Sequence, residues 1–356
     1  MVPTRREFIT TAMATGASAY AQAATDGNSP RKTRPHQESV SRGVKIDWVK
    51  KIYSDEQWNG WPDLAYWKDV YYICFANGAS HGSRDHRIML TTSRDLERWS
   101  PPREVLGPPG NHLESFFLAT PENLFIHASC QDGKRTYTNS IRSMDGQTWE
   151  GRKQAHDDGF IFWGQSEYRG KFYVAAHVDA KSTDYLLASA EGETWEQISL
   201  ISDNDVTETA LCFLDSGELM SISRRAPRDF AILCLAKPPY TRWHSLKTNA
   251  VVEGPALKKI ADRIIVSGRC SELVAHESIA RWYQESRRTG VFFYEDGKLE
   301  RQCLLPSGGD TGYPGILPMG KNNALIVYYS EHQTNDHPTP RYKHCGSIYL
   351  ASVTVT

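Results

Sequence analysis

Charged and aromatic residues recur at two points around the paired apolar runs of this sequence. Arginine guanidinium groups bind carboxylates through parallel hydrogen bonds, and histidine transfers protons near neutral pH. Such groups at matching positions predict a pocket that binds and transforms a polar ligand. Before the first runs stand Trp61, Glu114, Trp163, Glu208, Glu253 and Tyr313. After the second runs stand His81, His127, His177, Arg224, Arg225, Arg269, Glu331 and His332.

The elements that must position these residues are β-hairpins. From Val44 onward the apolar residues follow no helical period, and six paired runs turn at Gly, Asp or Asn. Each pair is followed by two further runs, so six units of about four strands predict an all-β, six-bladed β-propeller over residues 45–356. Its innermost strands would converge on a central channel. We expect the final run, 347–353, to pair with 48–53 and close the ring.

A repeated turn supports this array. The heptad Ser143-Met144-Asp145-Gly146-Gln147-Thr148-Trp149 predicts a tight turn between two strands, because Asp-Gly tolerates positive φ and the hydroxyls can bond to the backbone. Residues 189–195 repeat it closely, 93–99 are a degraded copy, and 239–243 keep only the turn and the tryptophan. The four tryptophans are separated by 50, 46 and 48 residues, a period typical of repeated supersecondary units.

Composition excludes several classes of protein. The 356 residues carry a net charge of −1, which argues against nucleic acid or an anionic membrane surface as the main partner. Seven cysteines occur without a Cys-x-x-Cys spacing, so we expect buried free thiols and no metal site of the common zinc type. The sequence has no phosphate loop, dinucleotide fingerprint or HExxH motif, and we predict no cofactor.

The N-terminus predicts export. Arg5-Arg6 precedes a mild apolar stretch and the small-residue site Ala21-Gln22-Ala23, which together indicate a twin-arginine signal peptide over residues 1–23. The stretch is too short to span a bilayer. Residues 24–44 are polar and contain proline, so we expect a disordered linker. The mature protein is then expected to be periplasmic or secreted.

The heptad turns, the six hairpins and the run 305–314 together resemble the sialidase (BNR/Asp-box) superfamily, and especially its bacterial exo-sialidase-like branch. The likeness spans residues 45–356. Sialidases carry a Glu followed about fifteen residues later by an Arg, as Glu208 precedes Arg224 by sixteen. The later Arg of the family matches Arg269, the Tyr of the last blade matches Tyr313, and the Asp after the first hairpin matches Asp85.

The resemblance implies a role for each matched residue. Tyr313 would be the nucleophile, Glu208 its activating base and Asp85 the general acid/base. A neutral phenol beside a carboxylate suits attack on an anomeric carbon, because it avoids charge repulsion. Arg224 and Arg269 would bind a substrate carboxylate. We therefore predict a glycoside hydrolase that removes a terminal acidic sugar, acting as a monomer with a glycan as its partner.

The chain departs from the family at one place. The first arginine of the sialidase clamp is replaced in the run Gly60-Trp61-Pro62, where Trp61 offers a stacking surface for a sugar ring. Arg225 or Arg87 could complete the clamp, or the sugar could be a uronic acid or neutral. Two other functions stay open. A propeller polysaccharide lyase would use His, Tyr and Arg on a uronate, and a glycan-binding propeller would need no catalysis.

Overall fold

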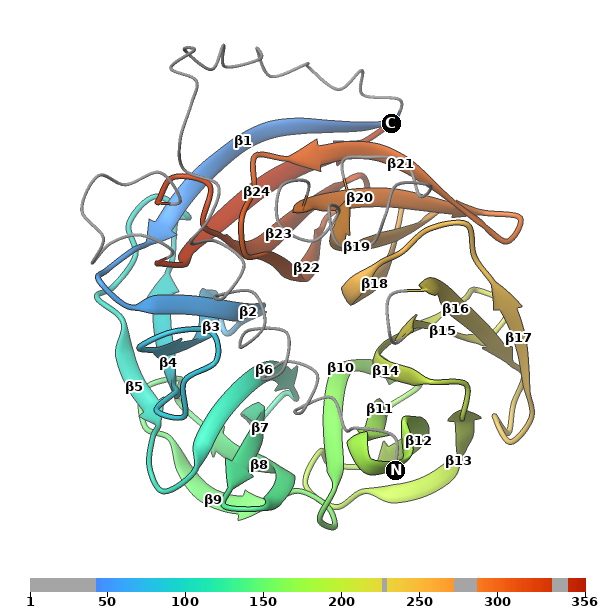
Figure 1. Cartoon of the computed structure of the whole chain (residues 1–356), viewed down its shortest axis with the longest axis horizontal. Helices are drawn as coiled ribbons and strands as arrows, with labels where there is room; N and C mark the ends of the chain where they lie inside the picture. Colours follow the sequence, from blue (N-terminus) through green and yellow to red (C-terminus); the bar gives the residue numbers. More distant parts are fainter. Residues whose placement is uncertain (1–42, 226–228, 272–286, 335–344) are drawn as a thin grey trace, which may run out of the picture. The chain divides into compact units, whose positions relative to one another are not determined.

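The computed structural model describes residues 43–225, 229–271, 287–334 and 345–356. The strands of these segments form six antiparallel four-stranded sheets, arranged as the blades of a β-propeller (Figure 1). The all-β, six-bladed fold predicted from the sequence is confirmed. The predicted signal peptide and nearly all of the predicted linker lie outside the described residues.

Three blades come from the first half of the chain. The first contains β2 (Trp58–Trp67), β3 (Val70–Gly78), β4 (Arg87–Ser93) and β5 (Arg103–Leu106). The second contains β6 (Asn111–Ala119), β7 (Leu124–Asp132), β8 (Arg135–Ser143) and β9 (Glu150–Gln154). The third contains β10 (Phe160–Tyr168), β11 (Lys171–Val178), β12 (Thr183–Ser189) and β13 (Glu196–Ser202), with the short 3₁₀ helix η1 (Asp179–Lys181) between β11 and β12.

The other three blades follow the same order until the last. The fourth contains β14 (Val206–Phe213), β15 (Leu219–Arg225), β16 (Asp229–Ala236) and β17 (Trp243–Lys247). The fifth contains β18 (Glu253–Ile260), β19 (Arg263–Ser271), β20 (Arg287–Glu295) and β21 (Lys298–Leu305). The sixth contains β22 (Thr311–Met319), β23 (Asn323–Ser330), β24 (Ser347–Val355) and, as its outermost strand, β1 (Val44–Tyr53).

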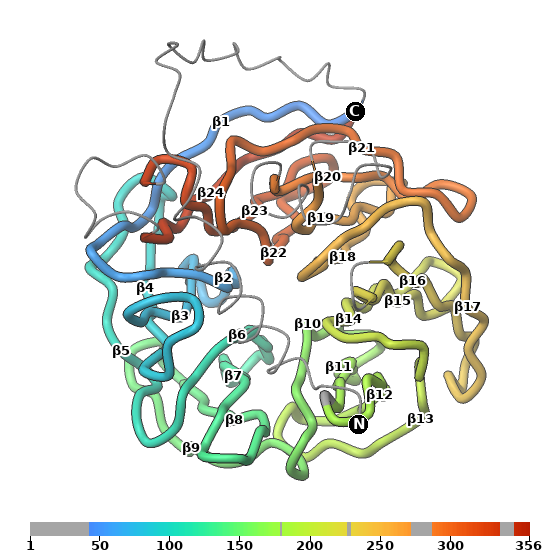
Figure 2. Tube along the Cα trace, viewed as in Figure 1, coloured from blue at the N-terminus to red at the C-terminus, as the bar shows by residue number. Residues whose placement is uncertain are grey.

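The outermost strand of the sixth blade closes the ring. β1 pairs antiparallel with β24, from Val44 opposite Val355 to Tyr53 opposite Ile348. In Figure 2 the first strand of the chain, in blue, lies beside the last, in red. This pairing was predicted from the sequence. It joins the two ends of the described propeller within one sheet, so no blade is left with an incomplete edge at the junction.

Burial explains the hydrophobic pattern of the blades. The middle strands pack between neighbouring blades, so they are apolar on both faces: β23 is buried at every position from Ala324 to Ser330. The outer strands face solvent, and β9, with the sequence Glu-Gly-Arg-Lys-Gln, is exposed throughout. Continuous apolar runs followed by short polar runs therefore mark successive strands of a blade.

The repeated heptads join the third and fourth strands of the first three blades. Between β8 and β9 the Asp145 Oδ1 accepts hydrogen bonds from the backbone N–H groups of Gln147, at 2.8 Å, and Thr148, at 2.7 Å. The Ser143 hydroxyl accepts from the Gly146 N–H at 2.8 Å. At the turn, side-chain oxygens accept the backbone N–H groups that have no partner strand, which explains why the same polar residues recur in each heptad.

The seven cysteines are buried and free, as predicted. Within the described segments no cluster of His, Cys, Asp and Glu could hold a metal ion. Nor does any helix of that part of the chain have the length and apolar character needed to cross a membrane.

The structure corrects the predicted ends of several strands. The residues placed after the second strand of their hairpins lie inside it in five cases: His127 in β7, His177 in β11, Arg224 and Arg225 in β15, and Arg269 in β19. The residues placed before the inner strands also lie inside them, among them Trp61 in β2, Glu208 in β14 and Tyr313 in β22. In the second strands the apolar run ends at these residues, but the backbone ladder and burial both continue, because His127, His177 and Arg269 are themselves buried polar residues. A residue just after an apolar run is therefore often still inside the strand.

Candidate active site

Each of the six inner strands departs from regular register near its start. The shift falls between Gly60 and Asp63 in β2, between Thr207 and Thr209 in β14, and between Gly312 and Gly315 in β22, with equivalents in β6, β10 and β18. Such bulges re-aim the side chains that they carry.

Three bulges hold a non-glycine residue in the left-handed region. Trp61 has φ of 49°, Glu208 of 56° and Tyr313 of 50°. This conformation costs about 1 kcal/mol or more for each such residue, and it persists only where the surroundings hold it. The three residues were all predicted site residues, and the strain therefore coincides with the proposed chemistry.

Tyr313, Glu208 and Arg224 form a closed triangle of hydrogen bonds. The Tyr313 hydroxyl donates to Glu208 Oε1 at 2.9 Å. Arg224 Nη1 donates to the same carboxylate oxygen at 2.7 Å and to the Tyr313 hydroxyl oxygen at 3.0 Å. Glu208 Oε2 accepts from the Gly254 N–H at 3.0 Å. The phenol thus faces a base that can take its proton and a cation that stabilises the resulting phenolate.

Gly254 makes room for the tyrosine. It has φ of +57°, and a Cβ at this position would lie 2.6 Å from Cγ of Tyr313. The Arg269 guanidinium lies 4.8 Å from the Tyr313 ring centroid, and Trp163 packs edge-on against the same ring at 5.7 Å. The Tyr313 ring is therefore packed between the Gly254 backbone, the Arg269 guanidinium and the Trp163 indole, and these contacts fix the orientation of its hydroxyl.

Glu253 links the two predicted clamp arginines. Its Oε1 lies 2.7 Å from Arg224 Nη2, and its Oε2 lies 3.5 Å from Arg269 Nη1. Glu208 and Glu253 are completely buried, and the Arg269 side chain is only 3% exposed. Removing one member would leave an uncompensated buried charge, so breaking any part of this network should destabilise the fold.

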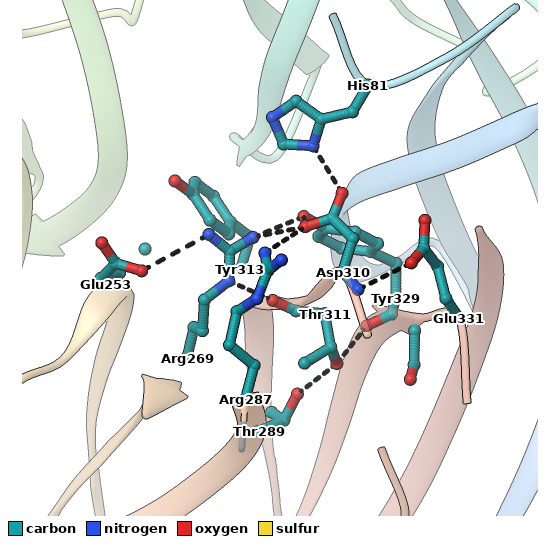
Figure 3. A network of polar contacts seen from close by, with 12 residues as sticks. His81, Glu253, Arg269, Arg287, Thr289, Asp310, Thr311, Tyr313, Tyr329 and Glu331 are labelled. Atoms are coloured by element: carbon teal, nitrogen blue, oxygen red, sulfur yellow. Dashed lines mark hydrogen bonds and ion pairs between the residues drawn. The ribbon is translucent and has the colours of Figure 1, made fainter. Parts of the chain in front are cut away.

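Asp310 is the second centre of the network (Figure 3). Its Oδ1 accepts from Arg269 Nη2 at 2.9 Å, from the Tyr329 hydroxyl at 2.9 Å and from Arg287 at 3.3 Å. Its Oδ2 lies 2.5 Å from His81 Nδ1 and accepts from the Trp58 indole at 3.2 Å. Burial raises the pKa of Asp310, but His81, Arg269 and Arg287 outweigh it and hold the pKa well below its usual range.

Glu331 behaves in the opposite way. Its Oε2 accepts a hydrogen bond from the Asp310 backbone N–H at 2.8 Å. Burial, followed by the negative charge of Asp310, raises the pKa of Glu331 to about 8. At neutral pH the two neighbouring carboxyl groups are therefore in different protonation states, an arrangement often found at functional sites.

The structure brings six of the predicted site residues together. Glu208, Arg224, Arg269 and Tyr313 form the polar network, as described above. Trp61 and His81 adjoin it through Trp58, which packs 4.5 Å from the Trp61 ring and 5.0 Å from the His81 ring while binding Asp310.

Four predicted site residues lie elsewhere. Arg225 is half-buried away from the network and binds Asp229 and Asn204. His127 is buried between Phe125, Phe162 and Trp195, where burial lowers its pKa to about 4. His177 is buried within β11.

Asp85 is exposed in the loop between β3 and β4, where its Oδ1 accepts from the Ala79 N–H at 3.1 Å. It lines a hollow of about 420 Å³ beside Arg84, Arg87 and Asn111. The loop carries His81, rather than Asp85, to the Asp310 network.

Sequence reasoning missed Asp310, Tyr329 and Arg287, and it counted Glu253 only among the ring of polar residues. One signal was present. Arg224, Arg269 and Tyr329 occupy the same register position, each opposite the residue that precedes the bulge. Aligning the hairpins on their bulges would have singled out Tyr329. Asp310 and Arg287 lie outside that alignment, so their roles depend on contacts across blades.

No protein-family model matches the chain, and no curated protein sequence matches it. Solved structures are similar in fold. A Dyadobacter fermentans protein described as of unknown function is 16% identical with a TM-score of 0.71, over 88% of this chain and 100% of that chain.

Two similar structures are sialidases. The phage phi92 endosialidase is 11% identical with a TM-score of 0.66, over 87% of this chain and 70% of that one. A Trypanosoma rangeli sialidase in complex with sialic acid is 10% identical with a TM-score of 0.59, over 89% of this chain. This chain spans 59% of the length of that sialidase. At these identities the likeness establishes the propeller fold.

Proposed function

We propose that this protein is a sialidase-type glycoside hydrolase that removes a terminal acidic sugar from a glycan. The observation that carries the proposal is the hydrogen bond from the Tyr313 hydroxyl to Glu208 Oε1, with Arg224 Nη1 within 3.0 Å of the same hydroxyl oxygen. Tyr313 attacks the anomeric carbon while Glu208 takes the phenol proton. A proton thus leaves the nucleophile as its bond to the sugar forms.

Three arginines supply the binding site for the acidic group. Arg224, Arg269 and Arg287 lie against three carboxylates, those of Glu208, Glu253 and Asp310. Arg224 is the most accessible of the three, with 16% of its side chain exposed, and it faces the nucleophile. We assign it the substrate carboxylate. Arg287 supplies the third arginine that the run Gly60-Trp61-Pro62 lacks. The predicted signal peptide supports action outside the cytoplasm, where glycans are available.

A polysaccharide lyase is the second candidate. The observation that favours it is the His81–Asp310 pair beside Tyr313 and a group of arginines. In an elimination, arginines neutralise the carboxylate of a uronate, one of the two side chains, histidine or tyrosine, abstracts a proton from the sugar, and the other donates a proton to the leaving oxygen. The two reactions give different products, because elimination leaves an unsaturated sugar that absorbs ultraviolet light and hydrolysis does not.

The test is release of sugar from a panel of sialylated, uronic-acid and neutral glycans. Wild type is compared with Tyr313→Phe and Glu208→Gln, and ultraviolet absorbance is recorded throughout. Cleavage without absorbance, abolished by both substitutions, supports the hydrolase and identifies the sugar. A product that absorbs ultraviolet light would show that the protein is a lyase and not a hydrolase. Binding of a glycan without any product, measured by calorimetry, would show a binding propeller instead.

A further inference from the structure

The loop between β3 and β4 places a histidine over the network. The Ser83 N–H donates to the Ser80 carbonyl at 3.0 Å, and Asp85 binds the Ala79 N–H, so the loop is folded as a local turn. The His81 ring packs edge-on against Trp58 and Trp61, each at 5.0 Å between ring centroids. Its side chain is still 35% exposed. The ring is thus oriented by its neighbours and open to a ligand on one side.

Asp310 fixes the direction of that ring. His81 Nδ1 lies 2.5 Å from Asp310 Oδ2. The carboxylate also accepts from Trp58, Tyr329, Arg269 and Arg287, so it is held from several blades. A carboxylate that accepts from Nδ1–H leaves Nε2 as the nitrogen that gains and loses a proton. In Figure 3 the second ring nitrogen of His81 points away from Asp310.

We propose that His81 is the acid–base catalyst of this site and that Asp310 is its positioning residue. The assignment rests on the proposed hydrolase function and deepens it. The resemblance assigns this role to Asp85, but the Asp85 carboxylate is exposed and binds its own loop. The same loop brings the His81 imidazole within hydrogen-bonding distance of Asp310. Asp310 also binds Arg269, whose guanidinium lies against the Tyr313 ring.

The proposed reaction proceeds in two steps. In the first, the Tyr313 oxygen bonds to the anomeric carbon, Glu208 takes the phenol proton, and the bond to the leaving oxygen breaks. Protonated His81 gives its Nε2 proton to that oxygen and becomes neutral. In the second, water bonds to the anomeric carbon and gives a proton to Nε2, while the bond to Tyr313 breaks and Glu208 returns its proton to the phenol oxygen.

Several titratable and charged groups lie around His81. Asp310 contacts it directly, and His86 lies beside the same two tryptophans. Arg269, Arg287 and Glu331 act through their contacts with Asp310. Of these groups, Asp310 is the one whose hydrogen bond orients the imidazole.

The experiment compares leaving groups. Glycosides of the cleaved sugar are prepared with a 2,4-dinitrophenyl group, which leaves without protonation, and with a methyl group, which needs it. For His81→Asn we expect kcat/KM to fall by about 10²-fold to 10⁴-fold on the methyl glycoside and by less than about tenfold on the activated one. In the same variant, azide should accelerate turnover of the activated substrate, because it needs no deprotonation by His81 to attack the anomeric carbon.

Controls separate the possible failures. His244→Asn alters an exposed histidine on the outer strand β17 and should match wild type. Asp310→Asn should show the same leaving-group dependence more weakly, because its amide still lies near Nδ1 of His81. This second variant tests the assignment if His81→Asn does not fold. Equal loss on both substrates in His81→Asn, or selective loss in Asp85→Asn, overturns the assignment and leaves the hydrolase standing. If wild type releases sugar from neither glycoside, the proposed function fails and takes the assignment with it.

Discussion

The two halves of the ring differ at one equivalent position. The residue opposite the start of each bulge is Ala76, Cys130 or Ala175 in the first three blades and Arg224, Arg269 or Tyr329 in the last three. The backbone is nearly the same in all six. At this position, small or apolar side chains in the first half complete the core, while long polar ones in the second half contribute to the site, which Trp58 and His81 of the first blade also join. A repeated fold supplies positions, and side chains decide their use.

The largest expected effect is at the nucleophile of the polar half. Tyr313→Phe and Glu208→Gln should each lower kcat/KM by roughly 10³-fold or more, because each removes a group that acts on the reacting bond. Tyr313→Phe changes side-chain volume little and should leave the melting temperature close to that of wild type. Glu208→Gln removes a buried charge that faces Arg224, so it should lower the melting temperature as well. Steady-state kinetics and thermal melts measure both. Retention of activity in Tyr313→Phe would remove the tyrosine from the mechanism.

An arginine of the polar half should matter for both folding and activity. Arg224→Met leaves the buried carboxylates of Glu208 and Glu253 without this partner. Breaking a buried ion pair from one side costs about 3–5 kcal/mol. We expect a clear shift of the urea midpoint together with loss of sugar release. A double variant with Glu253→Gln should recover part of the stability, and an unchanged midpoint in Arg224→Met would contradict the buried network.

A histidine of the apolar half should affect stability alone. His127→Ala removes a buried ring from between three aromatic side chains and loses the 2.9 Å contact with Gln165 Nε2. We expect a loss of about 2–4 kcal/mol, by analogy with other large-to-small core changes. Activity per folded molecule should remain that of wild type. A selective loss of kcat in this variant would mean that the core of the second blade is coupled to the site.

The stability of the fold should also depend on pH through Glu331. The pKa of this carboxyl is about 8 in the folded protein, against an ordinary value of 4.5. Between these values the folded state holds a proton that the unfolded state has released, so stability falls as pH rises. The slope should be at most about 1.4 kcal/mol per pH unit. Glu331→Gln should flatten the fall of melting temperature between about pH 5 and 8, and parallel curves would refute the shift.

The sequence was sufficient for the fold because blades are local. Alternating runs, turn heptads and the tryptophan period describe hairpins formed by neighbouring residues, and the pairing of β1 with β24 follows from one unit being short of a strand. Strand ends were less accurate. His127 and His177 follow apolar runs just as His81 does, but their strands continue past them and bury their rings.

Long-range partners lay beyond sequence reasoning. Tyr313 and Glu208 are 105 residues apart, and only the resemblance to sialidases paired them. His81 and Asp310 are 229 residues apart, and no motif in either segment predicts their contact. Asp310 stands in a loop-like run of Ser, Gly and Asp that suggests a turn. Its five donors come from β2, the β3–β4 loop, β19, β20 and β23, which meet only when the ring closes.

The sequence by itself determined the number of blades, the closure of the ring and the set of polar residues available near the ends of the inner hairpins. These depend on local periodicity, which each segment carries within it. The tertiary structure alone decided which of those residues meet, so that His81 joins the network while His127 becomes core and Arg225 pairs with Asp229. The physical reason is that burial and charge partners are properties of neighbours in space, and blades bring together side chains that the chain keeps far apart.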